Sequence, residues 1–201
     1  MSEEILINVT PTETRVAVVE NGMLQEVALE RNSHLGYLGN IYKGTVSRVL
    51  PGMQAAFIDI GLDRTAFLHA SDIHQVSLEQ MPEDPPPEPP ITSLVREGEE
   101  VVVQVIKDPL GTKGARLTTN LSIPSRFLVL LPERETLAVS VRIEDEIERN
   151  RLKGLLATMR EHKGKHGYIV RTNAENINEF ALSADMSYLQ KIWESINEQT
   201  R

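Results

Sequence analysis

Cysteine is absent from the 201-residue sequence, so the sequence holds neither a disulfide framework nor a thiolate metal site. Long apolar runs are also missing, and none reaches the roughly 18 residues that a membrane-spanning helix needs. The opening residues, MSEEILINVT, carry acids where a secretory signal peptide carries bases. These absences predict a cytoplasmic protein with no membrane contact.

A net positive charge is missing as well, because 21 Lys and Arg residues face 29 Asp and Glu residues. Phosphate affinity comes largely from Lys and Arg, so the total of -8 argues against a nucleic-acid binder. The acids are concentrated, however, since residues 72–100 hold eight acids and one base and therefore carry -7 of this charge. Charge alone is compatible with a generic acidic surface and with a nucleic-acid binder that has one acidic loop.

Residues 5–30 show the alternation of apolar and polar positions that is typical of half-buried strands. The apolar positions of three successive runs are Ile5, Ile7, Val9, Val16, Val18, Leu24, Val27 and Leu29. Asn21-Gly22 favours a tight hairpin turn between the last two runs, because both residues tolerate a positive φ. Three strands of this size make a poor independent domain. We therefore expect them to join a larger sheet, in this chain or in sequence outside it.

Two further stretches, residues 40–71 and 98–119, contain five short strand patterns separated by turn signals. Pro51-Gly52 and Pro109–Gly111 are the clearest of these signals. Five short strands with this spacing predict a small Greek-key barrel of the OB type.

The segment 72–95 interrupts the barrel pattern with six prolines within residues 82–90, PEDPPPEPP. Proline cannot donate a sheet hydrogen bond and favours an extended polyproline conformation. We interpret the segment as a long, mobile acidic insertion, with a ligand for a polyproline-binding module as the alternative. Because long loops add little closure entropy, we expect a deletion of residues 80–91 to leave folding and any nucleic-acid binding nearly intact.

Residues from about 120 onward predict an α+β region. FLVLL (127–131) indicates a buried strand, and GYIVRT indicates another that begins at Gly167. A helix is expected over about 143–162, and its apolar face comprises Ile143, Ile147, Leu155, Leu156 and Met159. A final helix is expected from about Ser183, a candidate N-cap with an acid following at Asp185. Its core face comprises Tyr188, Leu189, Ile192, Trp193 and Ile196.

Aromatic residues are scarce, yet two of the four Phe residues, Phe57 and Phe67, fall in neighbouring barrel strands. OB surfaces bind single-stranded nucleic acids by stacking bases on aromatic rings while basic side chains follow the phosphates. The same stretches contain the basic residues Lys43, Arg48, Arg64, Lys107, Lys113 and Arg116. From the residues alone, an exposed stacking surface and two rings inside the barrel core both remain open.

The barrel stretches also resemble a known family. GNIYKGTVSRVLPGMQAAFIDIGLDRTAFLHASDI, followed by VREGEEVVVQVIKDPLGTKGARLTT, is similar to the S1 domain of the RNase E/RNase G endoribonucleases, and most similar to RNase G. The likeness extends through the opening INVTPTETRVAVVENGMLQEVALER and through LSIPSRFLVLLP and GYIVRTNAE, and so covers nearly the whole chain.

The resemblance implies an α+β protein of several subdomains. Residues 1–36 resemble the N-terminal strands of a split RNase H-like subdomain, and residues 37–119 resemble an S1 (OB-fold) RNA-binding domain with the insertion 72–95. Residues 120–201 resemble a 5′-sensor subdomain. In the family, positions matching Phe57, Phe67 and Lys113 hold single-stranded RNA near the cleavage site.

A second implied site recognises a 5′-monophosphate. Arg171 and Thr172 match the family's arginine–threonine pair. This chemistry fits, because Arg makes bidentate, charge-assisted bonds to phosphate oxygens and Thr adds a hydroxyl donor. Val129 matches a neighbouring backbone contact. Ser125 stands at a second such contact, where some members have glycine, which is a departure from the family pattern.

The family hydrolyses RNA with Mg²⁺ held by aspartates of a subdomain that lies beyond the matched residues, so the resemblance implies no catalytic residue and no metal site here. The parent protein is expected to be a homo-oligomeric endoribonuclease of rRNA and mRNA processing, and the 201 residues a monomer or dimer. The carboxylates that fall on strand ends or turns show no spacing typical of two-metal catalysis. We interpret these residues, Asp59, Asp63, Asp72 and Asp108, as solvated.

The resemblance therefore implies binding of single-stranded, 5′-monophosphorylated RNA. Two alternatives remain. One is a stand-alone RNA-binding or assembly protein with no nuclease activity, and the other is a protein-interaction module that uses the proline-rich segment.

Overall fold

The computed structural model of the chain describes residues 2–32, 36–73, 89–163 and 166–200. The chain divides into two compact units, Met1–Tyr37 and Leu38–Arg201. Each is described by itself below.

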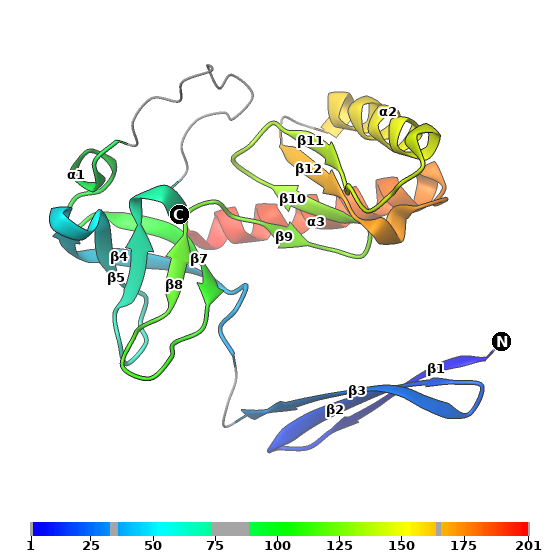
Figure 1. The fold of residues 1–201 in the computed structure, drawn as a ribbon, viewed down its shortest axis with the longest axis horizontal. Helices are drawn as coiled ribbons and strands as arrows, with labels where there is room; N and C mark the ends of the chain where they lie inside the picture. Colours follow the sequence, from blue (N-terminus) through cyan, green and yellow to red (C-terminus); the bar gives the residue numbers. More distant parts are fainter. Residues whose placement is uncertain (1, 33–35, 74–88, 164–165, 201) are drawn as a thin grey trace. The chain divides into compact units, whose positions relative to one another are not determined.

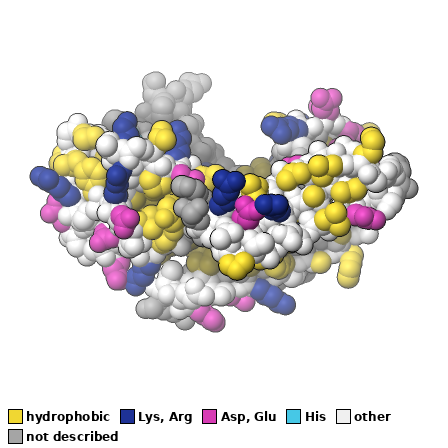
Figure 2. Space-filling view, turned by 90° about the horizontal axis from the view of Figure 1, so that it is seen from below, with side chains coloured by type: hydrophobic (Ala, Val, Ile, Leu, Met, Phe, Trp, Pro, Cys, Tyr) yellow, Lys and Arg dark blue, Asp and Glu magenta, His cyan; other side chains and the backbone are white. Residues whose placement is uncertain are grey.

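The first unit is an antiparallel sheet of three strands, β1 (Glu3–Val9), β2 (Glu13–Glu20) and β3 (Met23–Arg31), in the order β1-β2-β3. The hairpin predicted at Asn21-Gly22 is confirmed, because both residues have a positive φ, 50° and 80°. Within the described residues the sheet has no fourth strand, so the expected larger sheet does not form there. Figure 2 shows apolar side chains gathered on the surface of these strands, and Ile5, Ile7 and Val9 are 64–71% exposed.

The five-stranded barrel is confirmed (Figure 1). Its strands are β4 (Ile41–Leu50), β5 (Ala55–Asp59), β6 (Ala66–His69), β7 (Glu100–Lys107) and β8 (Arg116–Thr118). The barrel closes in the order β4-β5-β6-β8-β7, and β6 and β8 pair in parallel while the other neighbours are antiparallel. A short 3-10 turn, η2 (Pro51–Met53), connects β4 to β5 as the Pro-Gly signal indicates.

Successive side chains of a strand point to opposite faces, so every second residue of a barrel strand points into the barrel. The side chains inside the barrel are at most 1% exposed, and they include Val46, Ala56, Ile58, Ala66, Leu68, Val103, Val105 and Leu117. Space inside is tight at Gly44, where an added Cβ would lie 2.7 Å from Cγ2 of Ile58. Glycine at this position lets β4 approach β5 closely.

Part of the predicted loop 72–95 is ordered. A 3-10 turn, η3 (Ala70–Asp72), precedes it, and a single helical turn, α1 (Ile91–Leu94), closes it. Ile91 is fully buried and its backbone N–H donates to Oε1 of Gln54 at 3.0 Å. The expectation that residues 80–91 are dispensable is therefore wrong for the C-terminal end of this segment, because the deletion removes the core residue Ile91. Residues 74–88, including most of the proline run, lie outside the described part of the chain.

The C-terminal region is a mixed α+β layer. Its sheet contains β9 (Ile123–Pro124), β10 (Leu128–Leu131), β11 (Leu137–Val139) and β12 (Gly167–Val170), in the order β11-β12-β10-β9. The first helix, α2 (Glu146–Lys163), lies between β11 and β12 in the chain, and the second, α3 (Glu179–Thr200), comes after β12. The strands predicted at 127–131 and from Gly167 are confirmed, whereas β9 and β11 were not predicted. No helix among the described residues is long and apolar enough to cross a membrane.

Both helices pack on one face of this sheet. Leu128 and Leu130 of β10 are fully buried, and they pair with Val170 and Tyr168 of β12, which are at most 1% exposed. The same core contains helix residues Leu152, Leu156, Met159, Leu182, Met186 and Leu189, with Leu155, Ile192, Trp193 and Ile196 packed against it. The prediction that Trp193 belongs to the core is confirmed.

Four details of the helix predictions are wrong. Ile147 is 82% exposed and Tyr188 is 57% exposed, because each lies one position away from the face that packs on the sheet. Ile143 is buried as predicted but precedes the helix. The last helix begins at Glu179, so Ser183 lies inside it, and the side chain of Asn178 accepts from the N–H of Ala181 at 2.9 Å.

An ion pair between the buried carboxylate of Glu148 and the exposed guanidinium of Arg151 joins α2 to the segment after β12. Glu148 is 8% exposed and accepts two hydrogen bonds from the Arg151 guanidinium, at 2.6 and 2.7 Å. It also accepts from the backbone N–H of Asn176 at 2.8 Å, and Arg151 donates to the carbonyl of Ile177 at 2.9 Å. The hydrogen bonds from Arg151 lower the pKa of the Glu148 carboxyl below its ordinary value, against the opposing effect of burial.

This pair predicts a pH-dependent part of the stability. Because the pKa of Glu148 is lowered by folding, its stabilisation is present above the unfolded-state pKa and is lost as the pH falls through the lowered value. Glu148→Gln should reduce the free energy of unfolding at pH 7 by about 0.5–1.5 kcal/mol, because Arg151 and the N–H of Asn176 lose a charged acceptor while both donors stay accessible to water. Urea unfolding of both proteins from pH 7 to pH 3 measures this, and the two curves should converge at low pH. The exposed Glu194→Gln is the control, and a variant curve parallel to the wild-type curve at all pH values contradicts the prediction.

Candidate nucleic-acid interface

The alternation of β5 and β6 places both candidate rings outside the barrel. Phe57 lies between Ala56 and Ile58, and both neighbours are fully buried in the barrel interior. Phe67 lies in the same way between two fully buried residues, Ala66 and Leu68. Successive side chains of a strand point to opposite faces, so both rings face outward, and each is half-buried. The alternative that the two rings form the barrel core is therefore excluded by the structure.

The strand register aligns the rings with basic residues. Phe57 and Phe67 are direct cross-strand partners, and their ring centroids lie 6.2 Å apart at an interplanar angle of 68°. On β4, Arg48 is the partner of Phe57, and on β8, Arg116 is the partner of Phe67. Lys107 of β7 is in turn the partner of Arg116. One residue from each barrel strand thus contributes to a single row, in which two aromatic rings lie between basic side chains.

A groove of about 1110 Å³ lies over this row. Its lining combines apolar and charged side chains, and comprises Met53, Phe57, Asp63, Arg64, Thr65, Phe67, Lys107, Asp108, Pro109, Leu110, Thr112, Lys113, Gly114 and Arg116. Four of these residues are basic and two are acidic, so the groove is locally basic on a chain with a net charge of -8. A groove with two outward-facing, half-buried rings and surrounding basic side chains has the features that binding of single-stranded nucleic acid requires.

Lys113 reaches the groove from a tight hairpin. The backbone groups of Leu110 and Lys113 bond to each other at 3.0 and 3.2 Å, and Gly111 has a φ of +57°. The guanidinium of Arg64 donates to the carbonyl of Gly111 and so holds the hairpin tip. Behind it, a Cβ on Gly114 would lie 2.0 Å from the carbonyl oxygen of Thr65, so only glycine allows this approach.

Arg116 is held by a carboxylate. Its Nε and Nη2 atoms lie 2.9 and 2.8 Å from Oδ2 of Asp72, and the Asp72 side chain is only 17% exposed. The interpretation of Asp72 as a solvated turn residue is therefore wrong. Asp59 does adopt a turn role, because its Oδ1 accepts from the N–H of Gly61 at 2.9 Å.

The residues of the second candidate site converge at one end of β10 and β12. Arg171 directly follows β12, and Thr172 opens the short 3-10 turn η5 (Thr172–Ala174). The guanidinium of Arg171 donates to the main-chain carbonyl of Ser125. The backbone N–H of Arg171 donates to the carbonyl of Phe127 at 2.8 Å. Val129 lies on β10, four residues after Ser125. The structure thus brings together the Ser125–Leu128 turn and the Arg171–Thr172 pair.

Comparison with known proteins agrees with this geometry. The S1 RNA binding domain family matches residues 38–119, and the Ribonuclease E/G family matches residues 122–201. The chain is 51% identical over its whole length to Ribonuclease G of Escherichia coli K12, and 51% identical over 98% of its length to Ribonuclease G of Haemophilus influenzae. It is 38% identical over 92% of its length to Ribonuclease E of Nostoc sp..

The chain belongs to the ribonuclease E/G family. The resemblance drawn from the sequence motifs is thereby confirmed. The chain spans 40–41% of the length of these Ribonuclease G relatives and 26% of the length of the Ribonuclease E relative.

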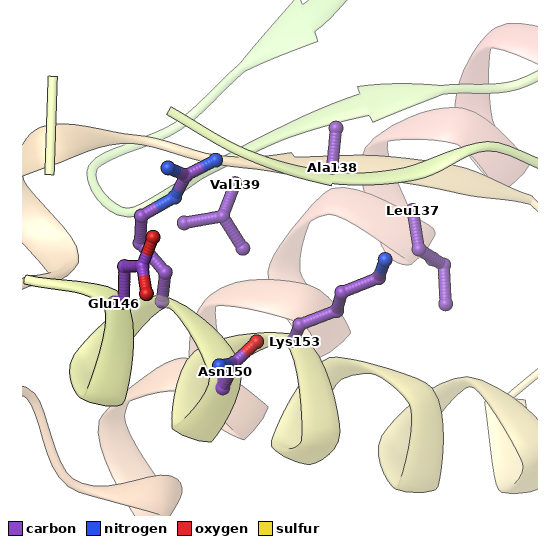
Figure 3. A pocket seen from close by; sticks show the side chains of 7 residues that line it. Leu137, Ala138, Val139, Glu146, Asn150 and Lys153 are labelled. Atoms are coloured by element: carbon purple, nitrogen blue, oxygen red, sulfur yellow. The ribbon is translucent and has the colours of Figure 1, made fainter. Parts of the chain in front are cut away.

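A second hollow in this ribonuclease E/G family member lies between β11 and α2 and has a volume of about 480 Å³ (Figure 3). Its lining comprises Leu137, Ala138, Val139, Glu146, Arg149, Asn150 and Lys153. Figure 3 shows Lys153 extending from α2 toward β11. None of the residues to which the family resemblance assigns RNA contact lies in this hollow, so the barrel groove is the better candidate interface.

The Mg²⁺ that the family implies does not fit the described residues. No group of three His, Asp or Glu side chains in them is close enough to hold a metal ion. No chemical step is therefore assigned to a metal in this part of the chain.

Some groove residues carry no signal that sequence reasoning detects. Met53 and Leu110 are 57% and 81% exposed at the groove, but an isolated apolar residue in a turn is uninformative in sequence.

Asp185 was expected near the N-terminus of a helix, whereas it bonds to the Ser125–Leu128 turn. Its partners are 57–60 residues away, so no local pattern reveals them.

The groove geometry predicts separate effects on binding and stability. Phe57→Ala and Phe67→Ala should each weaken binding of a short A/U-rich RNA by about 5- to 150-fold, because stacking contributes roughly 1–3 kcal/mol per base. Fluorescence anisotropy measures the affinity, and thermal unfolding measures the stability.

Two variants provide the controls for this prediction. Phe180→Ala removes an 83% exposed ring on α3 and should leave RNA affinity unchanged. Leu68→Ala removes a fully buried side chain and should lower the melting temperature strongly. The stacking role is contradicted if the Phe57 and Phe67 variants melt as Leu68→Ala does while RNA affinity measured on folded protein is unchanged.

Proposed function

We propose that this chain is the RNA-binding and 5′-monophosphate-sensing N-terminal region of a single-strand-specific, RNase G-like endoribonuclease that acts in rRNA and mRNA processing. The observation that carries the proposal is the row across the barrel, in which Phe57 and Phe67 are cross-strand partners between Arg48 and Arg116.

The groove favours unpaired nucleotides over a duplex. A base must leave its helical stack before it can lie on a phenyl ring, and this is least costly in a single strand. Lys107 and Lys113 border the same groove and provide charge for the phosphates that accompany the stacked bases. These side chains contact base faces and phosphates, which every nucleotide has, so the groove accepts RNA of many sequences.

The second site supplies the preference for a 5′ end. A terminal monophosphate presents more charge and more free oxygens than an internal phosphodiester, and a guanidinium matches these oxygens with paired N–H groups. Arg171 is exposed at the end of a strand, and the partner that the structure gives its guanidinium is a carbonyl. A neutral partner leaves the positive charge available for a phosphate.

The apolar surface of the N-terminal sheet supports the rest of the assignment. Ile5 and Ile7 on one face of the sheet, and Leu24 and Val27 on the other, are each more than half exposed, although the open face of a sheet is normally polar. We assign residues 1–36 to the N-terminal strands of a split RNase H-like subdomain, whose remaining part covers this apolar surface in a longer homo-oligomeric protein. In the same proposal, Mg²⁺-dependent hydrolysis is carried out by residues outside this 201-residue sequence.

The 5′-end preference is tested with two RNAs of one sequence, one with a 5′-monophosphate and one with a 5′-hydroxyl. The purified chain should bind the monophosphorylated RNA about tenfold or more tightly, because a charged hydrogen bond contributes about 1.5–3 kcal/mol. Arg171→Ala should remove the difference and leave binding of the hydroxyl RNA intact. Equal affinities for both RNAs, unchanged in the variant, contradict the sensor assignment.

Salt and cleavage measurements complete the test. The logarithm of the affinity should fall linearly with the logarithm of the salt concentration, because Lys and Arg displace counterions from the phosphates. A flat salt dependence favours a protein-interaction module instead. Mg²⁺-dependent cleavage of the RNA by the purified 201-residue chain contradicts the placement of catalysis outside it.

A further inference from the structure

Asp185 on α3 organises the turn that carries part of the candidate phosphate site. A single oxygen of this half-buried carboxylate, Oδ2, lies 2.6 Å from the hydroxyl of Ser125. The same atom accepts from the backbone N–H groups of Phe127 and Leu128, at 2.9 and 3.0 Å. Three donors of one four-residue turn therefore converge on one carboxylate oxygen.

The turn is bonded internally in a compatible way. The backbone N–H of Ser125 donates to the carbonyl of Leu128 at 2.8 Å, which closes the connection between β9 and β10. With the N–H groups of Phe127 and Leu128 directed to Asp185, the carbonyls of Ser125 and Phe127 are left for other partners. Both of these carbonyls accept from Arg171, one from its guanidinium and the other from its backbone N–H.

A chain of hydrogen bonds therefore runs from Asp185 through the turn to Arg171. The position of the guanidinium depends on the Ser125 carbonyl, and the position of this carbonyl depends on the carboxylate that holds the turn. Phosphate recognition by a guanidinium depends on angle as well as distance, since two N–H groups must meet two oxygens together. A small movement of the turn thus alters the orientation in which Arg171 meets its ligand.

We propose that Asp185 is a positioning residue for recognition of the RNA 5′-monophosphate, and that it acts through the Ser125–Leu128 turn on Arg171. The inference rests on the proposed function of Arg171. Asp185 itself does not touch the phosphate, because its negative charge is directed to the main-chain donors of the turn.

The experiment measures the ratio of the affinities for 5′-monophosphate and 5′-hydroxyl RNA, using the full 201-residue chain. Asp185→Ala should lower this ratio to that of Arg171→Ala, with affinity for the hydroxyl RNA unchanged. The Asp185→Ala, Arg171→Ala double variant should have no lower ratio than either single variant. Asp185→Asn keeps an acceptor oxygen at the same place and should retain more than half of the wild-type ratio.

A matched control separates positioning from general loss of stability. Asp145 also accepts from a backbone N–H, that of Ile147 at 2.8 Å, but it lies at the start of α2. Asp145→Ala should destabilise the fold and leave the affinity ratio unchanged at temperatures where the protein is folded. If Asp185→Ala does not fold, Ser125→Ala is used, which removes the shortest of the three bonds and should also lower the ratio.

The outcomes distinguish this inference from the proposed function. If the wild-type ratio is one, the 5′-end assignment fails, and the role of Asp185 fails with it. If the wild-type protein discriminates and Arg171→Ala does not, an unchanged ratio in Asp185→Ala overturns the positioning role alone. A ratio in Asp185→Asn as low as in Asp185→Ala, or an equal loss in Asp145→Ala, overturns it too.

Discussion

The pairing register of β5 and β6 is the constraint on which the barrel surface depends. Inside the barrel, Ala56 pairs with Leu68 and Ala66 pairs with Ile58, so each small interior residue lies beside a larger one, and all are fully buried. A slip by one residue would bury the two rings and expose the alanines, because side chains alternate with a period of two. The same strand register therefore determines both the barrel core and the outward position of Phe57 and Phe67.

Acidic residues hold both candidate RNA sites together, which reconciles the proposed function with the negative charge of the chain. Asp72 fixes Arg116 in the barrel, Glu148 holds the segment after Arg171, and Asp185 holds the Ser125 turn. A carboxylate that accepts several internal hydrogen bonds presents less field to an approaching phosphate than a solvated one, because its charge is compensated locally. Net charge is thus a poor guide to ligands when a protein uses its acids internally.

The sequence predicts features that repeat locally and fails where single long-range contacts decide. Strand alternation and Pro-Gly turns suffice for the barrel, whereas β9 and β11, with two and three residues, are too short to show any period. Helix phase was misjudged at Ile147 and Tyr188, since one apolar residue off the stripe is indistinguishable in sequence from one on it. The prolines likewise masked α1, whose stability comes from burial of Ile91 rather than from helix propensity.

In the proposed function, two moderate sites on one chain give a selectivity that neither has alone. The groove binds any unpaired strand, and the Arg171 site binds the terminal phosphate at one end of it. When both act on the same RNA, the second contact becomes intramolecular and the affinities combine through an effective concentration set by the intervening nucleotides. Preference for a 5′-monophosphate should therefore depend on RNA length as well as on Arg171. A strand too short to span both sites gains no combined affinity from its phosphate.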